Sequence, residues 1–342
     1  MLTERQLIIL QVIIDDFIET AHPIGSRALS KSEYLPYSAA TIRNEMADLE
    51  DLGFLEKTHT SSGRIPSEKG YRYYVDHLIG PMNQHEAGIL RKYTDGEFFE
   101  FEQVVQMTAE VLSELTNYTS IILGPEMFEA TLKQIQVLTL SDHTAVAILV
   151  TSTGHVEHRS FALPEGIASS DLEKLVNILN DRLKGVPIIR LGEVISTEVA
   201  QLMHRYMDDF EASFDLLRAF FMNEHPVKLY FGGKSNILMQ PEFNDVDKIR
   251  SFYALIEQED EIANLLKNTH QGIKVSIGNE NKVEAIKDLS LITASYHVGD
   301  NLMGTIALLG PTRMEYKKVI SLMKGISDEM TNTLDRWYKG DS

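Results

Sequence analysis

Residues 3–66 contain three helix patterns followed by two short strand patterns, and this order limits how the N-terminal segment can fold. A capping-box pattern begins the first helix at Thr3. Apolar residues at helical spacing continue this helix, and further helices are expected over 26–32 and 39–52. The stretch 54–66 has the pattern of a strand, a polar loop and a second strand. Three helices followed by a β-hairpin is the element order of a winged helix-turn-helix.

The helix expected over 39–52 has an apolar side and a side of small and polar residues. Its apolar stripe, which we expect to face the core of the same segment, consists of Ile42, Met46 and Leu49. Small residues on the other side would let the helix enter a DNA major groove, where asparagine and arginine can bind base edges through paired hydrogen bonds. Only the N-terminal end of such a helix has to approach the bases. The residues expected to contact DNA are Ser38, also a favourable N-cap, with Thr41, Arg43, Asn44 and, unless it belongs to a solvated helix face, Arg27.

The net charge of the chain is −18, because 50 aspartate and glutamate residues outnumber 32 lysine and arginine residues. Such a chain repels nucleic acid on average, so a DNA contact requires a local cationic patch. Residues 57–72 supply one, since Lys57, Arg64, Lys69 and Arg72 stand against Glu68 alone. We predict that Arg64, Lys69 and Arg72 contact phosphate or a minor groove, and that each lost phosphate contact flattens the salt dependence of log K by about 0.9. Periodicity and charge alone leave open that this segment binds protein instead.

The remainder of the chain predicts an α+β fold with a helical insertion. Strand patterns occur on both sides of a mostly helical stretch from 169 to about 223, and a capping-box pattern at Thr312 begins a final helix. The strand patterns before and after that stretch, including those between 135 and 163, are assigned to one sheet domain. The predicted domains are a winged helix-turn-helix at 1–82, the sheet domain at 83–165 and 226–342, and the insertion at 166–225.

The insertion is the expected dimer contact. One winged helix reads only a few base pairs, too few for a specific genomic site, so a two-fold dimer is expected. The N-terminal segment uses its apolar stripes in its own core, whereas the insertion carries periodic leucine, valine and methionine. It also contains an aromatic cluster, part of which could pack within the protomer: Phe210, Phe214, Phe220 and Phe221.

Several classes of function are excluded or disfavoured by the composition. The chain has no cysteine, which excludes disulfides, thiolate metal sites and a cysteine nucleophile. On a strand His155 and Glu157 would face one side and His158 the other, so no metal site is predicted. No catalytic residues and no cofactor are predicted, and the chain is not expected to be an enzyme. With no signal peptide and no long apolar run, a soluble cytoplasmic protein without membrane contact is expected.

Several motifs, in matching order along the chain, are shared with a known family. They lie at 41–47, 59–66, 69–72, 232–233, 236–238, 241–243, 277–281 and 310–316. Together they closely resemble the HrcA family of heat-inducible transcription repressors. Departures from the usual family pattern are small, and they occur at Ala39, Ser62 and Ser67.

This resemblance implies a repressor that binds an inverted-repeat operator upstream of chaperone operons as a dimer and blocks the promoter. It implies that the chaperonin GroEL favours the active form, that the sheet domain is GAF-like, and that the insertion is a dimerisation domain. It also adds residues of the loop between the two strands to the expected DNA contacts, namely His59, Thr60 and Ser61. The alternative is a GAF-like sensor in which a small molecule switches DNA binding.

Overall fold

The computed structural model describes residues 2–32, 35–57, 63–80, 101–124, 131–141, 143–152, 156–163, 169–199, 228–267, 272–298 and 302–339. The chain forms two compact units, and both contain helices and strands. The first unit comprises Met1–Gly124, Leu229–Tyr296 and Thr305–Thr331, and the second is chiefly Pro125–Lys228. This mixture confirms the α+β prediction in its general form.

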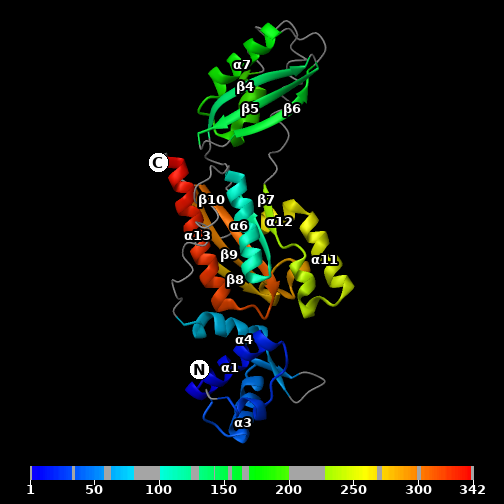
Figure 1. The fold of residues 1–342 in the computed structure, drawn as a ribbon, viewed down its shortest axis with the longest axis vertical. Coiled ribbons are helices and arrows are strands. Elements are labelled where there is room, and N and C mark those ends of the chain that lie inside the picture. The colour runs from blue at the N-terminus through cyan, green and yellow to red at the C-terminus, as the bar shows by residue number, and fades with distance from the viewer. Residues whose placement is uncertain are drawn as a thin grey trace. The chain divides into compact units, whose positions relative to one another are not determined.

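The N-terminal elements follow the predicted order (Figure 1). They are α1 (Glu4–Thr20), α2 (Ser26–Leu29), α3 (Ala39–Asp51), β1 (Leu55–Lys57) and β2 (Arg64–Pro66). β1 and β2 pair as an antiparallel hairpin. The caps predicted for α1 and α3 are present, because Thr3 closes a capping box with Gln6 and the Ser38 hydroxyl accepts a hydrogen bond from the Thr41 amide. The capping box predicted at Thr312 is wrong, since the last helix of the chain begins at Tyr316. Local sequence signals thus set where α1 and α3 begin.

α3 packs its predicted apolar stripe into the core of this segment. The buried side chains of α1 and α3 include Ile9, Leu10, Ile13, Ile14, Ile42, Met46 and Leu49. Glu45 of α3 is also buried, and its carboxylate pairs with Arg5 of α1. Ile24 and Arg64 exchange backbone hydrogen bonds of 3.2 and 3.0 Å, which attach the hairpin to the chain after α1. α3 is therefore fixed against its own segment on one side.

A further helix follows the hairpin. It consists of α4 (Glu68–Tyr73) and a π-helical turn, η1 (Tyr74–Leu78). Ser67 caps α4 by accepting a hydrogen bond from the Gly70 amide, and its hydroxyl donates to the Gly53 carbonyl at 2.7 Å. A Cβ on Gly70 would lie 2.3 Å from the Phe54 carbonyl oxygen. Only glycine therefore allows α4 to pack this closely against the chain that follows α3.

The rest of the first unit is a five-stranded sheet with helices, which we call the sheet domain (Figure 1). Its strand order is β7-β3-β10-β9-β8. The strands are β3 (Thr119–Leu123), β7 (Leu229–Gly232), β8 (Ile273–Ile277), β9 (Leu289–Val298) and β10 (Leu302–Pro311). The helices are α6 (Phe101–Thr116), α11 (Val246–Glu257), α12 (Glu259–Lys267) and α13 (Tyr316–Lys339), with short turns η4 (Asn236–Met239), η5 (Pro241–Phe243), η6 (Gly278–Glu280) and η7 (Glu284–Ile286). The last helix, α13, buries four apolar side chains at helical spacing: Val319, Leu322, Ile326 and Met330.

The second unit has an antiparallel sheet of its own. Its strands are β4 (Leu132–Ser141), β5 (Thr144–Thr151) and β6 (Val156–Ala162), in the order β4-β5-β6. Its described helices are α7 (Ser169–Leu183), η2 (Ile188–Arg190), α8 (Leu191–Val194) and η3 (Ile195–Val199). The Asn180 side chain of α7 bonds both the amide and the carbonyl of Ile135, each at 2.8 Å. One core joins sheet and helices, and it includes Leu132, Ile135, Leu149, Leu175, Leu179 and Leu183.

The assignment of the strand patterns between 135 and 163 to the sheet domain is wrong. These strands pair with one another in a separate sheet, which belongs to the second unit. The second unit therefore begins at Pro125 and contains a sheet, whereas the sequence predicts a mostly helical insertion over 166–225. Alternating burial of Ala145, Ala147 and Leu149 marks β5 as a strand. Alternation does not indicate which strand lies beside it, because that depends on pairing between distant residues. The predicted aromatic cluster lies outside the described residues: Phe210, Phe214, Phe220 and Phe221.

The second unit is inserted between two neighbouring strands of the sheet domain. β3 pairs antiparallel with β7, and Leu123 lies opposite Leu229. Opposed Cα atoms of antiparallel strands are about 4.5–5.5 Å apart. A short turn could therefore join β3 to β7 without changing the register of the sheet domain.

Candidate nucleic-acid interface

The N-terminal half of α3 presents a continuous solvent-facing side, as its helical spacing predicts. Ala40, Arg43, Asn44 and Ala47 are exposed and Thr41 is half-buried. Within the described part of the chain, no hydrogen bond or ion pair is made by the side chains of Arg43 and Asn44. These two side chains stand at the end of the helix that a major groove would receive.

Ser38 and Thr41 form the N-terminal cap of α3. The Ser38 hydroxyl accepts from the Thr41 amide at 3.1 Å and lies 2.9 Å from the Thr41 hydroxyl. Because helix N-termini attract anions, this end of α3 suits a phosphate group. Arg27 of α2 is exposed. The predicted loop contacts lie outside the described residues: His59, Thr60 and Ser61.

Arg64 of β2 is bound to Glu50 at the C-terminal end of α3, where the sequence predicts a phosphate contact. Its Nε and one terminal nitrogen each lie 2.6 Å from Glu50 Oε2. The Arg64 side chain is only 15% exposed and that of Glu50 30%. The guanidinium therefore joins the hairpin to α3 through a carboxylate and presents little surface to a DNA backbone.

Lys69 of α4 reaches the chain that follows α3. Its ammonium donates to the Leu52 carbonyl at 2.7 Å and lies 4.5 Å from the centroid of the Phe54 ring. The carbonyl groups at a helix C-terminus carry partial negative charge, which a lysine stabilises. Lys69 remains exposed, so its phosphate contact stays a prediction.

Arg72 of α4 is directed toward the sheet domain, and this differs from the predicted phosphate contact. Its Nε donates to Glu280 Oε1 at 2.8 Å, and one terminal nitrogen donates to the second oxygen of Glu280 and to the Val275 carbonyl at 2.7 Å. The other terminal nitrogen lies 3.2 Å from Asp76. All three guanidinium nitrogens therefore have partners inside the protein.

The acidic residues of α3 lie toward its C-terminal end. Asp48 and Asp51 are exposed, while Glu50 is paired with Arg64. At a rise of 1.5 Å per residue, Asp48 is about 10 Å along the helix axis from Thr41. The end of α3 that carries Arg43 is thus separated from the repulsive carboxylates.

Sequence reasoning missed the carboxylates that bind the two arginines. Glu50 is 14 residues from Arg64, and Glu280 is 208 residues from Arg72. Neither separation follows a local periodicity, so spacing gives no signal. The one available signal was the shared motif at 277–281, which the resemblance included without assigning it a contact.

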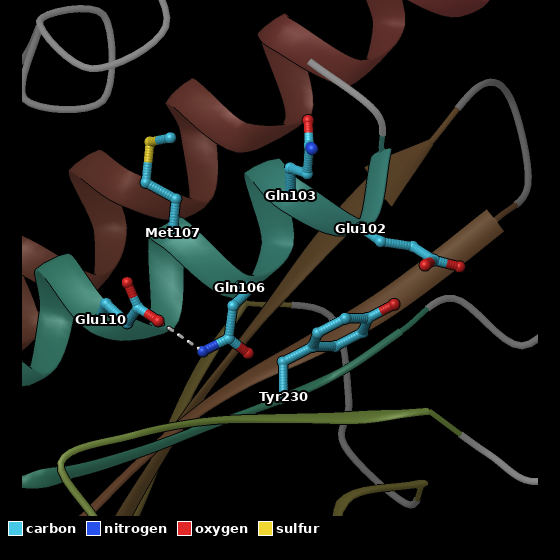
Figure 2. A pocket seen from close by; sticks show the side chains of 6 residues that line it. All are labelled: Glu102, Gln103, Gln106, Met107, Glu110 and Tyr230. Carbon is cyan, nitrogen blue, oxygen red and sulfur yellow. Dashed lines mark hydrogen bonds between the residues drawn. The ribbon is translucent and has the colours of Figure 1, made fainter.

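A shallow hollow lies between α6 and β7 of the sheet domain (Figure 2). Its lining residues are Glu102, Gln103, Gln106, Met107, Glu110 and Tyr230. The Gln106 amide donates to Glu110 at 2.7 Å and to the Phe231 carbonyl at 3.1 Å, so its donor group is used within the protein. The lining contains two glutamates and no cation, and its polar groups do not converge on a central point as in a metabolite site. The hollow gives no support to a small-molecule sensor.

Two further kinds of feature, a metal-binding cluster and a membrane-spanning helix, are absent from the described residues. No group of three or more histidine, cysteine, aspartate or glutamate residues there could hold a metal ion. No helix there is long and apolar enough to cross a membrane. His155, from the disfavoured metal pattern, lies outside the described residues.

The chain matches a known family along nearly its whole length. A family model described as the HrcA protein C terminal domain matches residues 102–320. The heat-inducible transcription repressor HrcA of Bacillus pumilus (strain SAFR-032) is 51% identical over 341 residues, which cover 99% of each chain. The chain belongs to the HrcA family. It is therefore a heat-inducible negative regulator of transcription, which acts in the stress response and is not an enzyme.

The HrcA relationship confirms the resemblance carried by the sequence motifs. The family model covers the second unit from Pro125 to Lys228 and the sheet domain up to the beginning of α13, and the Bacillus pumilus repressor also aligns through the segment that contains α3. A crystal structure of a hypothetical protein has the same fold, with a TM-score of 0.71 and 21% identity over 98% of this chain and 100% of that chain. At this identity, the likeness supports only the fold of this HrcA chain, not its function.

Replacing Arg64 tests whether its guanidinium binds Glu50 or a DNA phosphate. Arg64→Ala should lower the free energy of unfolding by about 1–2 kcal/mol, because the partly buried Glu50 carboxylate loses a charged hydrogen-bond partner. The slope of log K for DNA against log salt should stay unchanged. Arg250→Ala, which removes the exposed Arg250–Asp247 pair, is the control and should cost little. A flattened salt slope with unchanged stability would instead place Arg64 on phosphate.

Proposed function

We propose that this HrcA-family repressor binds an inverted-repeat operator upstream of chaperone operons with α3 and thereby blocks the promoter. The observation that carries the proposal is the exposed N-terminal half of α3, where Arg43 and Asn44 have no partner among the described residues. In this proposal residues 1–82 are a winged helix-turn-helix, α3 is its recognition helix, and β1 with β2 forms its wing. The buried opposite side of α3 supports this role, because it leaves one face for the groove.

The candidate residues have different roles in the proposed complex with DNA. Arg43 binds a guanine edge and Asn44 an adenine edge in the major groove. Ser38, Thr41 and the first amides of α3 bind a phosphate group, because they lie at a helix N-terminus. Flanking contacts to the DNA backbone come from Arg27, His59, Thr60, Ser61 and Lys69. Arg64 and Arg72 act inside the protein, since carboxylates bind both guanidinium groups.

The active form is proposed to be a two-fold dimer, joined through the second unit. The β4-β5-β6 sheet supports this proposal because it has apolar side chains on both faces. One face packs on α7. The other bears exposed Leu138, Leu140 and Val156, which are 52%, 65% and 53% exposed. Register places Leu138 opposite the half-buried Val146 and places Val156 opposite Val150. A second copy of this unit could cover such a face.

The remaining parts of the proposal are supported by membership in the HrcA family. The sheet domain is GAF-like, and its place in the chain connects the recognition helix to the dimerising unit. The chaperonin GroEL supports the active form, so repression is lost when heat occupies the chaperonin with unfolded proteins. The repressor works in the cytoplasm, where its DNA and the chaperonin are found.

Replacing Asn44 tests base reading by α3. The upstream fragment of a chaperone operon is first footprinted with the wild-type protein, with and without chaperonin, to locate the operator. Asn44→Ala should then weaken operator binding by about 1–3 kcal/mol and leave binding to a random duplex nearly unchanged. The measurement is a titration of each duplex at one salt concentration.

Asn244→Ala is the matched control, because it removes an exposed asparagine of the sheet domain. This control should bind the operator like the wild type. An equal loss on operator and random DNA would show that Asn44 only contacts the backbone. Absence of any protected site on the upstream fragment would contradict the proposed function as a whole.

Removing the second unit tests the dimer. Because Leu123 lies opposite Leu229, an Asn-Gly turn can replace 124–228 and close β3 to β7 as a two-residue hairpin. This variant should sediment as a monomer, bind a half-site weakly and bind the full operator hardly better. A folded variant that still sediments as a dimer at micromolar concentration would move the interface to another part of the chain.

A further inference from the structure

The DNA-binding segment and the sheet domain are joined by a charged contact between α4 and η6. Arg72 donates to Glu280 through two nitrogens, and it also bonds the Val275 carbonyl of β8 at 2.7 Å. Four residues before Arg72, Glu68 accepts hydrogen bonds from the Asn279 amide at 3.2 Å and from its side chain at 3.1 and 3.2 Å. We call these four side chains, Glu68, Arg72, Asn279 and Glu280, the clasp.

The backbone of η6 is shaped for this contact. Gly278 has φ +54°, which disfavours any residue with a side chain. A Cβ at this position would lie 2.0 Å from Glu68 Oε1. Glycine is therefore needed both for the turn and for the close approach of α4. The Ile277 amide also donates to Glu280 at 2.8 Å, which orients the carboxylate toward Arg72.

The charged state of the clasp follows from its surroundings. Partial burial acts to raise the pKa of Glu280, but hydrogen bonds from Arg72 and the Ile277 amide outweigh it, so the pKa of this carboxyl lies below its usual value. The hydrogen bond with Glu280 raises the pKa of the Arg72 guanidinium. Both groups are therefore ionised at neutral pH.

The apolar part of the same interface is imperfectly matched. The rings of Tyr71 on α4 and Tyr316 on α13 lie 5.9 Å apart. The Tyr71 hydroxyl is buried, yet it has no hydrogen-bond partner among the described residues. A buried hydroxyl without a partner opposes the favourable burial of its ring. The directional polar contacts of the clasp therefore add to what this apolar contact contributes to the orientation of α4 on the sheet domain.

A short path of contacts connects the clasp to α3. The Lys69 ammonium and the Ser67 hydroxyl, both next to Glu68, bond the Leu52 and Gly53 carbonyls directly after α3. Gly70 packs against Phe54 too closely for a larger residue. A rotation of α4 relative to the sheet domain would therefore carry α3 with it.

We propose that Arg72 and Glu280 are positioning residues for operator binding, which fix the orientation of α3 on the sheet domain so that both recognition helices of a dimer meet their half-sites together. This inference rests on the proposed function, since it needs an operator with two half-sites. Binding to the second half-site is intramolecular, so its strength depends on how often the second α3 has the right position. Loosening the clasp lowers the fraction of time that the second α3 is correctly placed, and it changes no contact between the protein and DNA.

Two roles of Arg72, positioning α3 through the clasp and contacting a DNA phosphate directly, predict opposite effects of Glu280→Gln on the affinity for DNA. The substitution removes a negative charge, which by general electrostatics leaves DNA binding unchanged or strengthens it. Glutamine still offers an oxygen to the Ile277 amide, so the turn can be kept. If the clasp positions α3, the same substitution weakens binding to the full operator.

The test compares full-chain variants on two duplexes, the footprinted inverted repeat and the same duplex with one arm scrambled. Glu280→Gln should lose about ten-fold or more in affinity for the inverted repeat and stay within about two-fold of wild type on the half-site. Arg72→Ala should show the same pattern, with an unchanged salt slope on the half-site. Glu284→Gln is the matched control, because Glu284 is 84% exposed and pairs with Lys287 of the same domain.

Each other outcome overturns the inference. Equal affinity of all variants for the inverted repeat would show that the clasp does not position α3. Equal losses on both duplexes would indicate a folding defect or a direct contact, and an Arg72→Ala loss with a flatter salt slope would place Arg72 on phosphate. If the wild type binds no upstream fragment, the proposed function fails separately. Hydrogen exchange of the Asn279 amide, which donates to Glu68, tests the clasp separately: slow exchange shows that the clasp forms in solution, and exchange as fast as in Glu68→Ala overturns the inference.

Discussion

The contact of Arg72 with Glu280 and the Val275 carbonyl is the constraint on which the placement of α3 depends. The N-terminal segment has its own small core, so it could adopt many orientations if only a flexible chain joined it to the sheet domain. Directional hydrogen bonds at α4 select one orientation. A second contact acts at α1, where Arg313 reaches the Ile18 carbonyl while it pairs with Glu242.

Four of the shared HrcA motifs supply residues to these contacts. The motif at 69–72 supplies Arg72, and the motif at 277–281 supplies Gly278, Asn279 and Glu280. Arg313 and its partner Glu242 come from two further motifs, at 310–316 and 241–243. Segments far apart in the sequence therefore meet where the N-terminal segment joins the sheet domain. A substitution in one of these motifs is expected to alter the contacts of the others.

Local features of this chain were predictable, and distant pairings were not. The caps at Thr3 and Ser38, the buried stripe of α3 and its exposed side all follow from spacing within one helix. Spacing also located the strands that became β4, β5 and β6, but it could not show that they form a separate sheet. Composition located the cations between 57 and 72, but the partners of Arg64 and Arg72 are set by tertiary packing, which local spacing does not encode.

The most direct test of this account is the distance between the N-terminal segment and the sheet domain in solution. The chain has no cysteine, so Glu56→Cys with Lys324→Cys places spin labels at two exposed positions, one on β1 and one on α13. Pulsed dipolar measurements use labelled chain diluted with unlabelled chain, so that only distances within one protomer are read. The account predicts one narrow distance distribution that broadens when Glu280→Gln is added. A distribution that is already broad without this substitution, and unchanged by it, would contradict the account.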